Sequence, residues 1–208
     1  MNATSATSVR GDAEVRRRGI LDAAAAILDV GGYAALTIRS VAKQAGMSPG
    51  LIYQYFVDKR DIFAALLLES QQELTAFIAE LPREQGVSAL IAAIVPETTK
   101  QWARVGHVAS VWRTTEDAAN SEGKSVQDLR HSTEAQFAEL QTALEDAART
   151  EGLVLREGRS LIPFVWAGLM GLADTIVNNW AQDLDPTEYI TYSADGLARA
   201  ITHRLELR

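Results

Sequence analysis

The sequence predicts an all-α protein of about nine helices, with a three-helix N-terminal domain joined to a larger helical C-terminal domain. Apolar residues recur at helical spacing along most of the 208 residues, which is typical of amphipathic helices. No segment alternates apolar and polar residues with the period of two that a half-buried strand shows. Glycine and proline interrupt the helical pattern where helices are expected to begin or end.

The N-terminal domain is expected over residues 14–60, after a small, polar tail at residues 1–13 that is predicted to be disordered. The first helix of this domain is predicted over residues 14–30. Gly31 and Gly32 follow it, and glycine readily adopts the backbone conformations that end a helix.

The C-terminal domain is expected over residues 61–208 and begins inside a helix that runs from Asp58 to Leu81, where Pro82 stops it. The final helix is predicted to start at the capping box Asp185-Pro186-Thr187-Glu188 and to end near Leu205. Between these two helices, further helices are predicted from Gly86, over residues 125–150 and over residues 159–182, with a loop at residues 117–124.

A 23-residue segment that begins at Thr37 predicts a helix, a tight turn and a second short helix. Thr37 occupies an N-cap position, and Gly46 supplies the positive φ that ends the first of these helices. Ser48 caps the second, whose inner face would be Ile52 and Phe56, four residues apart. Helix-turn-helix proteins place one helix in the DNA major groove in this way. An ordinary helical hairpin is the alternative, since helices are commonly joined by turns that contain glycine. Such a hairpin, however, does not need the N-caps, the glycine and the inner-face residues to occur together over 23 residues.

This segment resembles the TetR family of bacterial transcription regulators. The resemblance is carried by Thr37-Ile38-Arg39-Ser40-Val41-Ala42, by Ala45-Gly46-Met47-Ser48, and by Tyr53-Gln54-Tyr55-Phe56 with Lys59. It extends back through Arg18-Gly19-Ile20-Leu21-Asp22-Ala23-Ala24 and Gly31-Gly32-Tyr33, and so covers roughly residues 16–68. Leu51 stands where the family more often has Thr or Ala. The resemblance implies a homodimeric regulator whose affinity for DNA is lowered by a small molecule.

Ten residues are candidates for contact with a pseudo-palindromic operator in double-stranded DNA. The residues expected to bind phosphates are Thr37, Ser48, Tyr55 and Lys59. The residues expected to face bases are Pro49, Gly50, Leu51, Tyr53 and Gln54. Arg39 would contact either the DNA backbone or a base. The amide of Gln54 suits a bidentate contact with adenine, and Leu51 suits the methyl group of thymine.

The charge distribution also favours DNA binding, although the net charge of −7 does not. Residues 1–60 contain eight Lys/Arg and five Asp/Glu, whereas the other 148 residues contain twelve Lys/Arg and twenty-two Asp/Glu. A basic N-terminal segment joined to an acidic C-terminal part of the chain would orient the protein on DNA. Chance asymmetry of a solvated surface is the alternative.

Large side chains of the C-terminal domain are candidates for a ligand pocket, because such pockets are mostly apolar with a few polar groups. The candidate residues are Phe77, Trp102, His107, Trp112, Arg113, Phe137, Trp166, Met170 and Asn178. Aromatic residues at helical spacing belong to an ordinary core about as often. Neither the ligand nor the choice between repressor and activator follows from the sequence.

The last two helices are predicted to form the dimer interface. Their candidate residues are Leu161, Val165, Leu169, Leu172, Ile176, Trp180, Tyr189, Leu197 and Ile201. The helix at residues 159–182 is apolar on more than one stripe and must therefore be buried on several sides. Completion of the monomer's own core is the alternative.

Other functional classes fit the sequence less well. The three histidines lack metal-ligand spacing, and we expect no catalytic residue, metal or cofactor. A non-specific DNA binder would carry basic residues along the whole chain. There is no cysteine and no apolar run long enough for a signal peptide or a membrane span, so a cytoplasmic location is expected.

Overall fold

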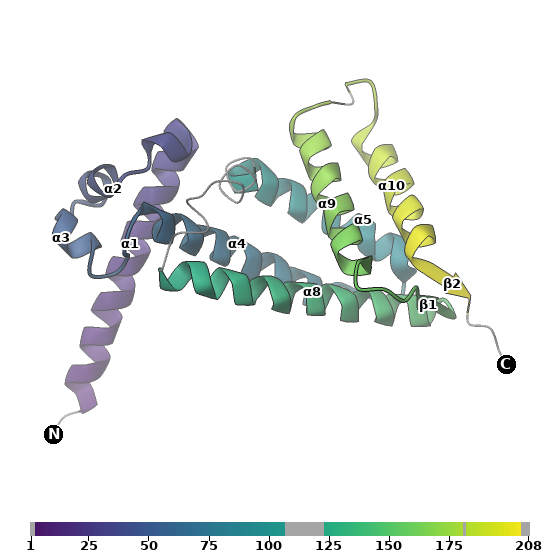
Figure 1. Ribbon diagram of the computed structural model, residues 1–208, viewed down its shortest axis with the longest axis horizontal. Coiled ribbons are helices and arrows are strands. Elements are labelled where there is room, and N and C mark those ends of the chain that lie inside the picture. The colour runs from purple at the N-terminus through teal and green to yellow at the C-terminus, as the bar shows by residue number, and fades with distance from the viewer. Residues whose placement is uncertain (1–2, 107–122, 181, 205–208) are drawn as a thin grey trace. The chain divides into compact units, whose positions relative to one another are not determined.

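The structure is a computed structural model, and it describes residues 3–106, 123–180 and 182–204 (Figure 1). These ranges contain eight α-helices, a π-helical turn and two three-residue strands, so the predicted all-α class is confirmed. The chain divides into two compact units. Of the described residues, 3–69 and 123–130 form what we call the head unit. Residues 70–106, 131–180 and 182–204 form the body unit.

The head unit contains α1 (Ala3–Ala35), α2 (Ile38–Ala45), α3 (Pro49–Ile52) and the beginning of α4 (Lys59–Glu80) (Figure 1). The predicted stop after the first helix is confirmed at Gly32, whose φ of 63° and ψ of −170° interrupt α1. Buried apolar side chains from all four helices form the core of this unit, chiefly Ile20, Leu21, Leu36, Val41, Ile52, Phe56, Ile62 and Phe63.

The helical backbone of α1 begins at Ala3, inside the segment at residues 1–13 for which disorder stays a prediction from composition. The segment is polar, but it contains several alanines and no proline. A helix that is already formed extends at low cost through such a sequence, because each added residue gains one hydrogen bond.

The predicted division at residue 60 falls inside α4, and the head unit continues to Glu69. The reason is that the first turns of α4 bury Ile62, Phe63 and Ala64 completely. A similar boundary lies inside α8 (Lys124–Thr150), whose first residues also belong to the head unit. Most of the predicted loop at residues 117–124 lies outside the described residues.

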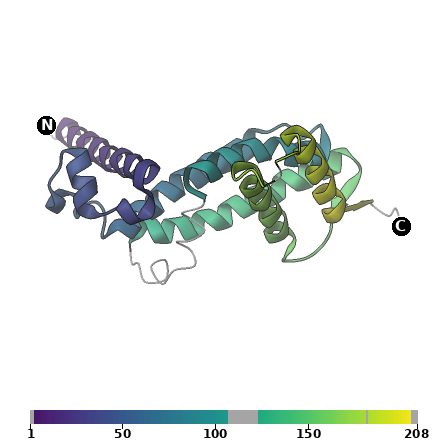
Figure 2. The ribbon, with the colours of Figure 1, turned by 90° about the horizontal axis from the view of Figure 1, so that it is seen from above.

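The body unit continues from α4 with α5 (Gly86–Gln101) and a π-helical turn, η1 (Trp102–Gly106). It then contains most of α8, followed by α9 (Leu161–Val177) and α10 (Pro186–Ile201). The last two helices lie side by side in Figure 1 and in the view from above in Figure 2.

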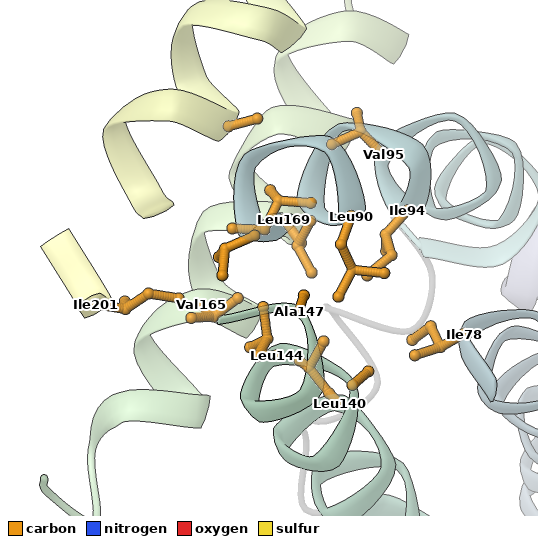
Figure 3. Close-up of a cluster of buried hydrophobic side chains, with 14 of the residues drawn as sticks. Ile78, Leu90, Ile94, Val95, Leu140, Leu144, Ala147, Val165, Leu169 and Ile201 are labelled. Atoms are coloured by element: carbon orange, nitrogen blue, oxygen red, sulfur yellow. The ribbon is translucent and has the colours of Figure 1, made fainter. Parts of the chain in front are cut away.

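The core of the body unit is formed by aliphatic side chains from five helices. Figure 3 shows Ile78, Leu90, Ile94, Leu140, Leu144, Val165 and Leu169 pointing toward one another. At Gly168 a side chain would lie 2.9 Å from Leu197 Cδ2, so this glycine permits the close approach of α9 and α10.

Two short strands were not predicted. Strand β1 (Leu153–Leu155) pairs antiparallel with β2 (Thr202–Arg204), and Leu153 lies opposite Arg204. Three residues are too few to show an alternating pattern in the sequence. Strand β2 also explains why the final helix ends at Ile201 and not near Leu205.

Two carboxylates fix the starts of helices in the body unit. Asp185 accepts hydrogen bonds from the backbone N–H of Glu188 and Thr187, which lower its pKa, and so it caps α10 as predicted. Glu151 accepts the backbone N–H of Val87 at 2.9 Å and thereby caps α5 from a distant part of the chain. None of the described helices is sufficiently long and apolar to cross a membrane.

Candidate nucleic-acid interface

The turn of the predicted helix-turn-helix is held by local hydrogen bonds. Thr37 and Ser40 form a reciprocal capping box, in which the side chain of each accepts the backbone N–H of the other. At the other end of α2, Gly46 has φ 65° and ψ 30°, the left-handed conformation that favours glycine. The backbone N–H of Met47 then donates to Ala42 O at 2.9 Å and closes the turn.

The second helix of the motif is short but continues as a helical turn beyond its formal end. Ser48 Oγ accepts the backbone N–H of Leu51 at 3.2 Å, and Pro49 follows in the first turn, both as predicted. The N–H of Phe56 donates to Ile52 O at 3.0 Å, so the helical hydrogen bonds extend through residue 56. Ile52 and Phe56 are both buried, which anchors this segment on the head unit.

The predicted DNA-contacting residues all lie on the surface of the head unit. Seven of them are exposed, namely Thr37, Arg39, Ser48, Pro49, Gly50, Tyr53 and Gln54. Leu51, Tyr55 and Lys59 are half-buried. Tyr53 is 59% exposed, so much of this residue is accessible to solvent.

Lys43 was missed by sequence reasoning and is exposed on α2, one helical turn beyond Arg39. The spacing of four residues between the two cations would have indicated that they share one helix face. Together they add positive charge next to the recognition segment.

Aromatic rings hold two of the cations of the head unit. The Lys59 ammonium lies 4.4 Å from the centre of the Tyr33 ring, which in turn packs edge-on against Phe63. The Arg17 guanidinium lies 5.5 Å from the centre of the Phe56 ring. These contacts tie α1 to the recognition segment and to the start of α4, and they place Lys59 beside the recognition segment.

Ion pairs join α1 to α4. Arg18 donates to Glu69 and to Asp22, each at 2.9 Å, and Arg17 lies 3.7 Å from the same Glu69 carboxylate. Partial burial acts to lower the pKa of Arg18, but the hydrogen bond and charge of Glu69, helped by Asp22, outweigh it and raise the pKa. Arg18 therefore remains cationic and positions the two helices.

Asp61 is a buried carboxylate with a structural role that the sequence did not reveal. Its Oδ2 accepts the N–H of Val57 at 3.2 Å, and its Oδ1 accepts the N–H of Ser125 at 2.8 Å. The side chain is 2% exposed. One residue thus fixes both the segment that leaves the recognition helix and the first turn of α8.

The predicted ligand-binding residues fall into three groups. Phe77, Phe137, Trp166 and Met170 are half-buried against the core of the body unit, and the rings of Phe137 and Trp166 lie 5.9 Å apart. Trp102 Nε1 and Asn178 Nδ2 both donate to Asp174 Oδ1, at 3.0 and 2.8 Å. His107, Trp112 and Arg113 lie outside the described residues.

The predicted dimer residues require a correction. Val165, Leu169, Leu172 and Ile201 are buried in the core of the body unit, where no partner can reach them. Half-buried members of the set pack against the same core, namely Leu161, Ile176, Tyr189 and Leu197. Only Trp180 is largely exposed, at 75%. The reason is that α9 uses one apolar stripe for its own core and leaves Phe164 on another stripe exposed.

Comparisons with known proteins place the motif in a family. Residues 20–66 match the family model described as bacterial regulatory proteins, tetR family. The chain is 42% identical over 71 residues to the HTH-type transcriptional regulator HbdR of Aromatoleum sp. strain CIB, a match that covers 34% of this chain and 30% of HbdR. It is 35% identical over 100 residues to the regulator BetI of Rhizobium meliloti strain 1021, covering 42% of this chain and 49% of BetI. The chain thus spans less than half the length of these relatives.

The whole fold also has solved counterparts. The transcriptional regulator FadR from Bacillus subtilis, solved in complex with stearoyl-CoA, aligns with a TM-score of 0.61. The alignment covers 87% of this chain and 97% of FadR at 21% identity. At that identity the likeness shows the fold alone.

Proposed function

We propose that this chain, which belongs to the tetR family of bacterial regulatory proteins, is a homodimeric transcription regulator that binds a pseudo-palindromic operator. The observation that carries the proposal is the exposed recognition segment at residues 48–55, anchored from beneath by the buried Ile52 and Phe56. In this proposal the head unit binds DNA, and the body unit binds an effector and dimerises. The relatives are transcriptional regulators, so we set an enzymatic role aside.

Within the head unit, residues at the exposed ends of the motif are suited to bind DNA phosphates, and residues in its middle are suited to contact bases. Ser48 uses its oxygen to cap α3 and still has a hydroxyl proton to donate to a phosphate. The Lys59 ammonium, held over Tyr33, adds a fixed positive charge. Gln54 and Tyr53 are exposed on the recognition segment, where they would face base edges in the major groove.

The dimer in this proposal uses the exposed side of α9 and the region next to it. Large apolar residues are exposed there, namely Phe164, Val177, Trp180, Leu184 and Tyr192. Exposed large apolar side chains of this kind would be covered by a partner in the proposed dimer. A two-fold dimer would present two head units to the two halves of a palindrome.

An effector is proposed by analogy, because FadR of Bacillus subtilis has been solved with stearoyl-CoA. We propose a small, largely hydrophobic effector for this chain, whose binding to the body unit releases a repressor from its operator. Helices α4 and α8 both contribute residues to the two units and are the elements through which such a signal would pass. A ligand-independent regulator or an activator of the same fold is the alternative. Such a regulator would act in the cytoplasm, where the DNA is.

Two substitutions in the head unit test the proposed roles. Gln54→Ala should weaken binding to the preferred site by roughly 1–3 kcal/mol and relax the preference at one base pair. Lys59→Met keeps an apolar stem over Tyr33 but removes the charge, so it should weaken binding to all sequences alike. It should also reduce the slope of log affinity against log salt by about 0.9. Gel-shift titrations on selected and random duplexes at several salt concentrations measure both effects.

Gln127→Ala is the matched control, because Gln127 is exposed in the head unit but on α8. It should leave affinity and salt slope unchanged. Equal losses on selected and random DNA for Gln54→Ala and Lys59→Met would contradict the separation into base-reading and phosphate-binding residues.

A further inference from the structure

One side of α10 carries exposed residues along the length of the helix. These residues are Glu188, Tyr192, Gly196 and Arg199. Residues three or four positions apart are neighbours on a helix surface, so the four form one stripe, which we call the α10 stripe. The stripe begins with an acid, ends with a base, and has an aromatic residue and a glycine between them.

The body unit leaves the α10 stripe open. Ala194, on the opposite side of α10, is buried in the core, and Asp195 on the flank accepts a hydrogen bond from Ser88 of α5. On the stripe itself, Tyr192 is 75% exposed. A side chain added at Gly196 would meet no described atom within 4 Å. An aromatic side chain and an open position beside a glycine are therefore available to a partner.

The two ends of α10 carry opposite charges. Asp183 and Glu188, both exposed, lie just before the helix and in its first turn. Arg199 is exposed in the last turn, and α9, the loop and the rest of α10 contain no other lysine or arginine. The backbone N–H of Arg156 donates at 2.7 Å to the last residue of α10, which brings a second exposed arginine to this end, beside Glu157.

A helix with this order of charges is complementary to a second copy of itself. Glu188 and Arg199 form no ion pair with any other described residue, so each is open to a partner. If two copies of α10 lie antiparallel, the acidic end of one meets the basic end of the other, whereas a parallel pair would bring like charges together. A two-fold axis that crosses the helix between Ser193 and Ala194, halfway along the stripe, produces the antiparallel arrangement.

We propose that the α10 stripe binds the same stripe of a second copy of this chain in antiparallel orientation, with Glu188 of each copy paired with Arg199 of the other. The inference rests on the homodimer of the proposed function and specifies how its two chains are aligned. In this register Tyr192 of one copy covers Gly196 of the other, where the missing side chain lets the ring approach the helix backbone. The two ion pairs would discriminate against partner helices with another order of charges.

The first test reverses one charge at a time in the full chain, without DNA. Glu188→Lys brings two cations together at each end of the interface, and Arg199→Glu brings two acids together. Each variant should raise the dissociation constant of the dimer at least about a hundred-fold, because like charges face each other twice. Sedimentation equilibrium measures this constant, and circular dichroism measures the helical content. A dimer of either variant as tight as that of the unaltered chain would overturn the inference.

The second test mixes the two variants. In a dimer of one Glu188→Lys chain and one Arg199→Glu chain, opposite charges again face each other at both ends. The mixture should therefore form one-to-one dimers within about ten-fold of the original affinity. The chain that carries both substitutions should dimerise by itself for the same reason. Failure of either to associate would contradict the antiparallel pairing, because no other alignment of the two helices predicts both rescues.

Gly196→Gln tests the contact with the aromatic ring. The new side chain meets nothing within 4 Å in one copy, so the helix should be retained. It would occupy the place of the Tyr192 ring of the other copy and should raise the dissociation constant at least about ten-fold. Unchanged association would count against the register.

Glu134→Lys is the matched control for charge, because Glu134 is an exposed acid of the body unit on α8. It should leave the dimer unchanged, and a dimer weakened as much as by Glu188→Lys would show that net charge is responsible and not the α10 stripe. An unaltered chain that is monomeric would overturn the homodimer of the proposed function together with this inference. A dimeric chain that none of the stripe variants weakens would overturn this inference alone.

Discussion

Phe56→Ala should lower the free energy of unfolding of the head unit by about 3–5 kcal/mol and abolish operator binding. The Phe56 ring is 2% exposed, and it is both the anchor of the recognition segment and the surface against which Arg17 lies. Its removal leaves a cavity where the recognition segment meets α1. Hydrogen exchange of peptides from residues 20–66 measures the effect locally, and gel shifts measure the loss of binding.

Tyr53→Ala is the control for this prediction, because Tyr53 is on the same segment but largely exposed. It should change stability by less than about 0.5 kcal/mol and still weaken DNA binding. If Phe56→Ala retains normal exchange protection, the segment is not anchored as described.

Replacement of Phe164 and Trp180 together by glutamate should give a folded monomer and reduce operator affinity by about a thousand-fold or more. Both side chains are exposed apolar residues of the body unit, so the substitutions do not disturb its core. Each head unit alone would contact only one half-site. Light scattering after gel filtration gives the oligomeric state, circular dichroism the helical content, and gel shifts the affinity.

Two further variants make this test specific. Leu197→Glu should destabilise the body unit itself, because Leu197 packs against the core and against Gly168. Val30→Glu replaces an apolar residue that is even more exposed than Phe164 and Trp180 but lies outside α9 and α10, and it should leave the dimer intact. A double mutant at Phe164 and Trp180 that remains dimeric would show that the interface lies elsewhere.

The helix-turn-helix could be predicted nearly residue by residue because its signals are local. Thr37, Gly46 and Ser48 each act on the backbone within five residues of themselves. The inner positions of Ile52 and Phe56 follow from helical spacing alone. Local hydrogen bonding and helical periodicity are properties that a single sequence displays directly.

The body unit could be predicted only as a set of helices. Helix α9 is apolar on several stripes, and the sequence does not tell which stripe packs inward, so Val165 and Leu169 were assigned to a partner although they fill the core. Contacts between distant residues, such as Trp102 with Asp174, leave no periodic signal. The buried contacts of Asp61 were missed for the same reason, since Ser125 is 64 residues away.

The most direct test of the account is selection of duplexes from a random library by the full chain, followed by sequencing and measurement of stoichiometry. We expect two inverted half-sites whose centres are about one helical turn, ~34–36 Å, or a multiple of it, apart, bound by an even number of chains. Enrichment of a single unpaired half-site by one chain, or no enrichment over random sequence, would contradict the claim that this protein is a two-fold symmetric, sequence-specific DNA-binding regulator.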